Sequence, residues 1–190
     1  DCRHEVDGIQ YYCTVSGGIA VFCQDGSSYT ELLTSASGAL EASKHKGKNK
    51  CTLYDEELIH TRLRSLEIMD RLRSSVMNHM EGFSVVYQPI VRSSDTKIAE
   101  AEALLRWSCK DMGSVSPLEF IPLLESSGLI IPVGKWVLEQ SVRQCCKWLA
   151  CVPDFVMNVN CSYLQMLDED FVQSVKEIIN RYRLDPSHIV

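Results

Sequence analysis

Apolar and polar residues alternate along this chain with two periods, one typical of strands and the other of helices. Segments rich in β-branched and aromatic residues, or apolar at every second position, predict strands at 11–22, 51–54, 83–91, 97–107 and 155–161. Segments with apolar residues at steps of three or four predict helices at 29–46, 56–80, 117–127, 133–149 and 168–182. The last three residues begin a further extended segment.

The helix predicted at 56–80 is the longest of these and carries one apolar stripe. Its apolar residues follow one another at steps of three or four: Ile59, Leu63, Leu66, Met69, Leu72, Val76 and Met80. No Gly or Pro interrupts the pattern, and Gly82 follows it. We therefore expect one continuous helix that packs on the C-terminal part and joins two domains rigidly. This divides the chain into 1–55, a connector at 56–82, and 83–190.

From Phe83 onwards, strands and helices follow one another along the chain. This order favours a parallel sheet with crossover helices, either open or closed into a barrel. We therefore expect an α/β fold. Because the chain begins with Asp1 rather than Met and ends as an extended segment starts, we also expect it to be cut from a longer protein, inside a domain.

The composition narrows the classes of function. A net charge of −6 argues against binding to DNA or RNA, which needs clustered Lys and Arg. No apolar run reaches the roughly 18 residues of a membrane-spanning helix, and no signal peptide opens the chain. The nine cysteines include no CxxC pair. We interpret them as free thiols of a reducing cytoplasm, with a secreted disulfide protein as the alternative.

Polar residues occupy one face of the strand predicted at 97–107. Because strand side chains alternate between faces, Glu100, Glu102, Leu104 and Arg106 share a face, and the opposite face is wholly apolar. A buried parallel strand is normally apolar on both faces. The polar face therefore indicates either a functional site, or an internal salt bridge or contact with solvent at a sheet edge.

The strand predicted at 155–161 shows the same pattern, with Asn158, Asn160 and Ser162 on one face. Carboxylate and amide oxygens are hard ligands that suit Mg²⁺ or Mn²⁺ better than Zn²⁺. At the C-terminal ends of barrel strands, such residues would lie on the usual active-site face. The alternative is that the amides bind backbone groups of a nearby loop.

Several motifs from Phe83 onwards resemble those of EAL domains, in order and at natural spacing. They are the opening strand Phe83–Val91 with Tyr87-Gln88-Pro89, the name-giving triplet Glu102-Ala103-Leu104 before Leu105-Arg106-Trp107, the segment 116–130, the segment 134–138, and Val159-Asn160-Cys161-Ser162. The triplet alone carries no weight, but the ordered set is specific. The resemblance implies a fold similar to a TIM barrel, of which this chain holds the N-terminal half.

EAL domains hydrolyse one phosphodiester bond of cyclic di-GMP to give linear pGpG, with two Mg²⁺ or Mn²⁺ ions. The resemblance implies that Glu102 and Asn160 are metal ligands. It also implies that Gln88 and Arg106 hold the dinucleotide and that Pro89 and Leu104 shape the pocket. The family's other acidic ligands and its catalytic Lys lie on later strands, so the resemblance predicts half a site and no activity for this chain alone.

The first part of the chain resembles the last third of a GGDEF domain. The resemblance lies in the strand Thr14–Ala20 and in the segment 36–49. This sequence departs from the family at Ser37, Glu41 and Ser43, where the family usually has Asp, Tyr and Ala. The signature loop of that family would lie before Asp1, so a diguanylate cyclase activity of the parent is neither predicted nor excluded.

Two functions from different classes follow from these resemblances. The first is a cytoplasmic bacterial signalling enzyme, a cyclic di-GMP phosphodiesterase. The alternative is a catalytically inactive receptor for cyclic di-GMP or a protein-interaction module. A homodimer, an upstream sensor domain and a membrane anchor elsewhere in the parent are left open, and an unrelated α/β fold is a third interpretation.

Overall fold

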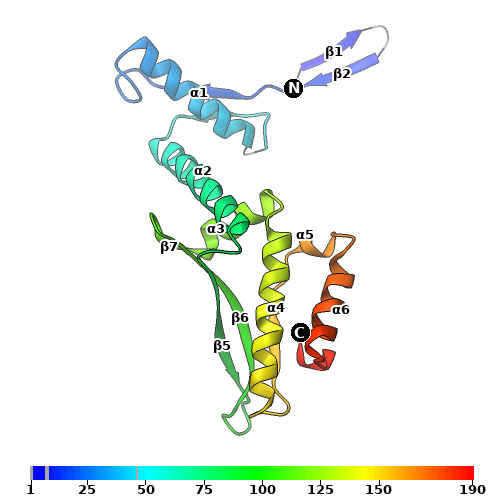
Figure 1. Cartoon of the computed structure of the whole chain (residues 1–190). Helices are drawn as coiled ribbons and strands as arrows, with labels where there is room; N and C mark the ends of the chain where they lie inside the picture. The colour runs from blue at the N-terminus through cyan, green and yellow to red at the C-terminus, as the bar shows by residue number, and fades with distance from the viewer. Residues whose placement is uncertain (1, 7–8, 46) are drawn as a thin grey trace. The chain divides into compact units, whose positions relative to one another are not determined.

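The computed structural model describes residues 2–6, 9–45 and 47–190. These residues form two compact units, Asp1–Arg64 and Ser65–Val190, each with helices and strands (Figure 1). Within the described residues, no helix is long and apolar enough to cross a membrane.

The first unit contains two pairs of strands and one covering helix. Strands β1 (Cys2–Val6) and β2 (Ile9–Cys13) form an antiparallel pair. Strand β3 (Gly17–Ile19) pairs in parallel with β4 (Cys51–Leu53), and α1 (Tyr29–His45) forms the crossover between them. A side chain at Gly18 would approach the carbonyl oxygen of Ala36 to 1.9 Å, so this glycine allows α1 to pack directly on β3. The strand expected at 11–22 is thus two shorter strands.

Helix α2 is continuous over Glu56–Met77 and ends three residues before the predicted limit. His79 and Met80 have positive φ angles of 56° and 65°, a left-handed backbone that cannot continue the helix. In the second unit, Ile68 and Leu72 of α2 are buried in one core cluster with Phe83 and Trp107. Packing on the C-terminal part is therefore confirmed, and the rigid connection of two domains stays a prediction.

The second unit is built on a four-stranded sheet in which β6 (Ile98–Cys109) has three neighbours. Strands β5 (Phe83–Val91) and β7 (Gly113–Val115) pair antiparallel with β6, and β8 (Val156–Val159) pairs parallel with it. The predicted parallel sheet is therefore wrong for β5. Its connection to β6, residues 92–97, is a short turn without a crossover helix, so the chain must reverse.

The end of the chain continues the parallel arrangement. Ile189 forms a parallel bridge with Met157, and the N–H of Val159 donates to the carbonyl of Val190 at 2.7 Å. The extended segment predicted at the last three residues is therefore confirmed for its final two, after a short 3₁₀ helix η1 (Pro186–His188).

Helices pack against one face of this sheet. They are α3 (Pro117–Ser126), α4 (Ile130–Leu149), the single turn α5 (Tyr163–Met166) and α6 (Phe171–Tyr182). Ala101, Ala103 and Met157 are at most 3% exposed and share a core cluster with Val142 and Cys145 of α4. The apolar face predicted for β6 is thus the face that the helices cover.

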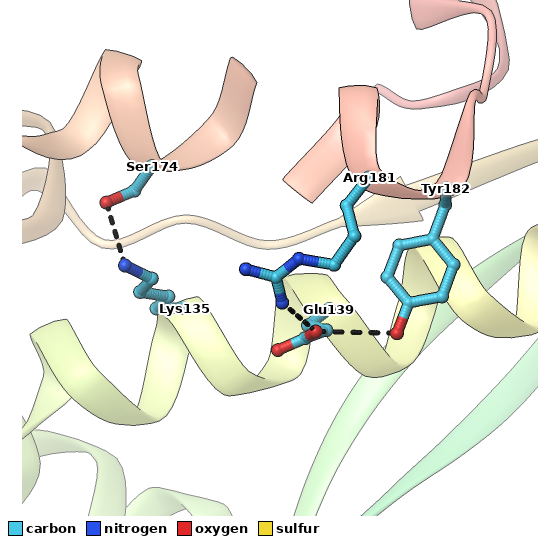
Figure 2. Close-up of polar contacts among 5 residues, drawn as sticks. All are labelled: Lys135, Glu139, Ser174, Arg181 and Tyr182. Carbon is cyan, nitrogen blue, oxygen red and sulfur yellow. Dashed lines mark hydrogen bonds and ion pairs between the residues drawn. The ribbon is translucent and has the colours of Figure 1, made fainter. Parts of the chain in front are cut away.

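Polar contacts join α4 to α6 at the surface (Figure 2). The guanidinium of Arg181 donates to Glu139 Oε1 at 2.6 Å, and the hydroxyl of Tyr182 donates to the same oxygen at 3.4 Å. One α-helical turn away, Lys135 Nζ donates to Ser174 Oγ at 3.2 Å. These contacts join the two helices along their exposed sides.

Candidate functional site

The predicted site residues lie mainly on the sheet face opposite the buried alanines. In the register of the sheet, Gln88 of β5 lies opposite Glu102 of β6, and Glu102 lies beside Asn158 of β8. Arg106 is four residues beyond Glu102 on the same strand, so alternation gives it the same face. Gln88, Glu102 and Arg106 therefore share one face of the sheet, and their roles in a site stay predictions.

Two carboxylate–amide pairs bridge β6 to β8 and the residues after it. Asn158 Nδ2 donates to Glu100 Oε2 at 2.9 Å, and Asn160 Nδ2 donates to Glu102 Oε1 at 2.7 Å. Asn160 directly follows the last residue of β8 and is exposed, whereas Asn158 is partly buried. The predicted convergence of Glu102 and Asn160 at the end of the strand is therefore confirmed.

The pairs also bear on the salt-bridge interpretation of the polar face. In the part of the chain that the structure describes, neither Glu100 nor Glu102 forms an ion pair, and the Arg106 guanidinium donates instead to the carbonyl of Leu105 at 2.9 Å. An internal salt bridge along this face is thus not what holds these groups. The amides bind side-chain carboxylates and not loop backbone.

The donor atoms at Glu102 and Asn160 fit a hard divalent cation, because a carboxylate oxygen and a carboxamide oxygen are both typical ligands of Mg²⁺ and Mn²⁺. The described residues hold no cluster of three or more His, Cys, Asp or Glu side chains suited to a metal. Desolvation raises the pKa of the Cys161 thiol beside Asn160, although the residue as a whole is exposed.

A cavity of about 250 Å³ lies at this end of the sheet. Its lining includes Leu104, Arg106 and Asn160 from the predicted site, together with Glu125, Ser162 and Gln165. Arg106 and Asn160 therefore border one hollow, whose other lining residues are mostly apolar and come from α3, α4 and the helix-covered face of β6. Neither Gln88 nor Glu102 lines this cavity.

Pro89 is the predicted site residue that the structure places elsewhere. Alternation along β5 turns it away from Gln88, and it lines an apolar cavity of about 370 Å³ with Tyr87 and Trp148. Its register partner is the buried Ala101. Among the described residues, β5 pairs with β6 alone and is an edge strand, where a proline is tolerated because the N–H that it lacks is not needed for a second neighbour.

Three residues beside Asn160 were not predicted as part of the site. Ser162 Oγ donates to Glu125 Oε1 of α3 at 2.6 Å, and the Ser162 N–H donates to Gln165 Oε1 at 3.1 Å. The sequence offered one signal, since Ser162 shares the alternating polar positions with Asn158 and Asn160. Glu125 lies in the segment 116–130 that resembles the EAL family, but its position there indicated no role.

The chain matches the model of the EAL domain family over residues 69–190. It is 32% identical over 189 residues to the bifunctional diguanylate cyclase/cyclic di-GMP phosphodiesterase MucR of Pseudomonas aeruginosa, covering 99% of this chain and 27% of that protein. It is 29% identical over 177 residues to the cyclic di-GMP phosphodiesterase PdeR of Escherichia coli, covering 93% of this chain and 26% of that protein. The chain thus spans about a quarter of the length of these relatives.

Solved structures give the same family. The structure of the PaMucR phosphodiesterase in complex with c-di-GMP has a TM-score of 0.60 and 35% identity, over 65% of this chain and 49% of that chain. The EAL enzyme Bd1971 with cAMP and cyclic di-GMP bound has a TM-score of 0.61 and 26% identity, over 86% of this chain and 43% of that chain.

Proposed function

Because this chain belongs to the EAL domain family, we propose that it is part of a cyclic di-GMP phosphodiesterase, which cleaves one phosphodiester bond of the dinucleotide and releases linear pGpG. The observation that carries this proposal is the 2.7 Å contact between Asn160 and Glu102, on the sheet face that also presents Gln88 and Arg106. Relatives named as cyclic di-GMP phosphodiesterases, and a related structure with the dinucleotide bound, support the choice of substrate.

The proposed role of each site residue follows from the chemistry of its side chain. Glu102 and Asn160 would hold Mg²⁺ or Mn²⁺, and two such ions would activate a water molecule and neutralise charge on the phosphate. Arg106 would bind a phosphate of the substrate, since a guanidinium pairs with phosphate oxygens through two parallel donors. Gln88 would donate from its amide to the dinucleotide.

Two apolar residues would shape the pocket. Leu104 lies between Glu102 and Arg106 on the same face and would exclude water beside them. Pro89 faces the helices, so we propose that it acts through the backbone of β5, where its fixed φ angle constrains the neighbouring Gln88.

We further propose that the remaining acidic ligands and the catalytic Lys belong to a longer protein that contains this sequence. The alignment to about half of the related phosphodiesterase structure supports this. One carboxylate and one amide are few ligands for a cation that prefers near-octahedral coordination. The 190-residue chain alone would therefore bind metal weakly and leave cyclic di-GMP intact.

For the N-terminal part, we propose the C-terminal segment of a GGDEF domain at 1–55 and a connector at 56–82, followed by the EAL half at 83–190. The parallel β3–β4 pair with α1 as its crossover supports an α/β segment of this kind. The parent would be a cytoplasmic bacterial signalling protein. Seven cysteines with described side chains are free thiols, which supports a reducing compartment, while Cys2 and Cys13 lie outside the described side chains.

A second candidate is a receptor or interaction module that binds cyclic di-GMP without cleaving it. The departures at Ser37, Glu41 and Ser43 favour it, because they indicate a neighbouring domain that has drifted from its family. Ser43 is fully buried, and its hydroxyl is satisfied by the carbonyl of Lys50, so this departure is accommodated in the fold. A homodimer and an upstream sensor domain are compatible with either candidate.

Incubation of the full-length protein that contains this sequence with cyclic di-GMP and Mn²⁺ tests the proposal. The expected product is linear pGpG, and its formation should stop when a chelator removes the metal. Tight binding without product at any metal concentration would favour the receptor. The absence of both binding and product would contradict both candidates.

A further inference from the structure

The segment that follows β8 is held by contacts on both sides of Asn160. Before it, the Val159 N–H donates to the carbonyl of Val190 at 2.7 Å. After it, Ser162 is bound to two different parts of the fold. Asn160 is exposed, and its side-chain bond to Glu102 depends on where these anchors place its backbone.

The first anchor of Ser162 is a side chain on α3. The Ser162 hydroxyl donates to Glu125 Oε1 at 2.6 Å, across 37 positions in the sequence. A hydrogen bond to a carboxylate is shorter and stronger than one between neutral groups. This contact ties the start of α5 to the C-terminal turn of α3.

The second anchor is Gln165, which is 7% exposed. The side-chain Oε1 of Gln165 accepts from the Ser162 N–H at 3.1 Å. The backbone N–H of Gln165 donates to the Ser162 carbonyl at 3.0 Å. The Gln165 amide rests on Gly134 of α4, where an added Cβ would lie 1.9 Å from Gln165 Nε2. A Cβ at position 134 would collide with the Gln165 side chain where it now lies, so the turn packs directly on α4.

We infer that Glu125, Ser162 and Gln165 are positioning residues, which hold the two-residue step from Ser162 back to Asn160 so that the Asn160 carboxamide meets Glu102. Once Ser162 is fixed, only Cys161 separates it from Asn160, so few backbone rotations remain between them. The geometry stands by itself, and its importance for metal binding rests on the proposed function. Groups that orient a metal ligand typically change metal affinity about 10- to 100-fold when they are removed.

The test measures Mn²⁺ affinity of the full-length protein by the electron paramagnetic resonance signal of free Mn²⁺, together with turnover of cyclic di-GMP. Ser162→Ala should weaken Mn²⁺ binding about tenfold. Ser162→Thr keeps the hydroxyl and should restore most of the affinity. Ser127→Ala is the matched control, because it removes a hydroxyl that donates to the Leu123 carbonyl at 2.7 Å on the same α3 turn without touching the segment.

Glu125→Ala removes the other partner of the same hydrogen bond and should also weaken Mn²⁺ binding, so it serves if Ser162→Ala does not fold. Thermal melting monitors the folding of every variant. The KM for cyclic di-GMP should stay within about twofold, because Arg106 and Gln88 are not displaced. If Ser162→Ala and Glu125→Ala bind Mn²⁺ as Ser127→Ala does, the positioning role is overturned, even when the protein turns over substrate.

The reverse outcome separates the two proposals. If the unaltered protein binds Mn²⁺, loses that affinity with Ser162→Ala and never cleaves cyclic di-GMP, the positioning role stands and the phosphodiesterase proposal fails. If the unaltered protein binds no Mn²⁺, both are overturned.

Discussion

Asn160 donates a 2.7 Å hydrogen bond to Glu102 from a position 58 residues further along the chain. A parallel pair lies one step away on the same strands, where Asn158 donates to Glu100 at 2.9 Å. The two pairs share their chemistry and differ in place, since Asn160 follows the end of β8 and Asn158 lies within it. Substitution of Glu100 is therefore a matched control for substitution of Glu102.

Substitution of Arg106 tests the binding of substrate phosphate. Arg106→Ala should raise the KM for cyclic di-GMP about 10- to 100-fold, because it removes charge-assisted hydrogen bonds to a phosphate. The Mn²⁺ dependence should change little. Steady-state kinetics of the full-length protein measure both, with Arg143→Ala as the control, since Arg143 pairs with Gln140 on the outside of α4. An unchanged KM would remove Arg106 from the site.

The contacts between α4 and α6 in Figure 2 are expected to stabilise the fold only modestly. The side chains of Arg181 and Glu139 are 59% and 30% exposed, so solvent screens their attraction. Glu139→Ala should lower the free energy of unfolding by about 0.5 to 1 kcal/mol, and Lys135→Ala by less. Urea denaturation of the 190-residue chain measures both. Equal losses for the two variants would show that the ion pair adds nothing.

A buried polar contact anchors the end of α2 in the core. Trp107 Nε1 donates to Ser75 Oγ at 3.1 Å, and both residues are buried. Ser75→Ala should cost about 1 to 3 kcal/mol, because it leaves the indole N–H without a partner. The neighbouring Ser74 is exposed, so Ser74→Ala should change the free energy of unfolding by less than about 0.5 kcal/mol. Tryptophan fluorescence during denaturation reports both.

The buried thiol of Cys145 makes stability depend on pH in the alkaline range. Burial raises the pKa of Cys145 from 9.0 to about 11. The folded state therefore keeps a proton that the unfolded state loses, and the contribution is complete below pH 9 and lost as pH rises towards 11. The alkaline fall in the free energy of unfolding should be shallower in Cys145→Ala than in the unaltered chain.

Cys151→Ala is the control for this effect, because Cys151 is an exposed free thiol. It should retain the alkaline slope of the unaltered chain. Thermal melting at several pH values between 8 and 11 compares the three proteins, in a range set by the raised pKa. Identical slopes for all three would show that Cys145 is not kept neutral by the fold.

The sequence predicted much of the helical structure, because helices are local. The predicted limits of α3 differ from the observed ones by a single residue, and the apolar stripe of α2 placed Leu72 in the core. It missed α5, a single turn of four residues, because so short an element has no repeating apolar pattern. The direction of β5 was also missed, since strand periodicity does not record which way a neighbour runs.

The site was predictable where alternation along a strand determines the face. That rule brought Glu102 and Asn160 together correctly, because the two strands pair in parallel. It could not identify Glu125, whose contact with Ser162 depends on how α3 packs beside the segment after β8. The motif predicted Pro89 in the same site as its neighbour Gln88, but Pro89 lies on the other face of β5, towards the helices.

The role of Glu102 as a metal ligand is tested by hydrolysis of cyclic di-GMP with Mn²⁺, compared between the Glu102→Gln and Glu100→Gln variants of the full-length protein. Both substitutions remove one negative charge from the same face of β6. We expect that Glu102→Gln abolishes pGpG formation at every Mn²⁺ concentration, while Glu100→Gln retains most of it. Equal activity in the two variants would contradict the assignment of Glu102 as the metal ligand.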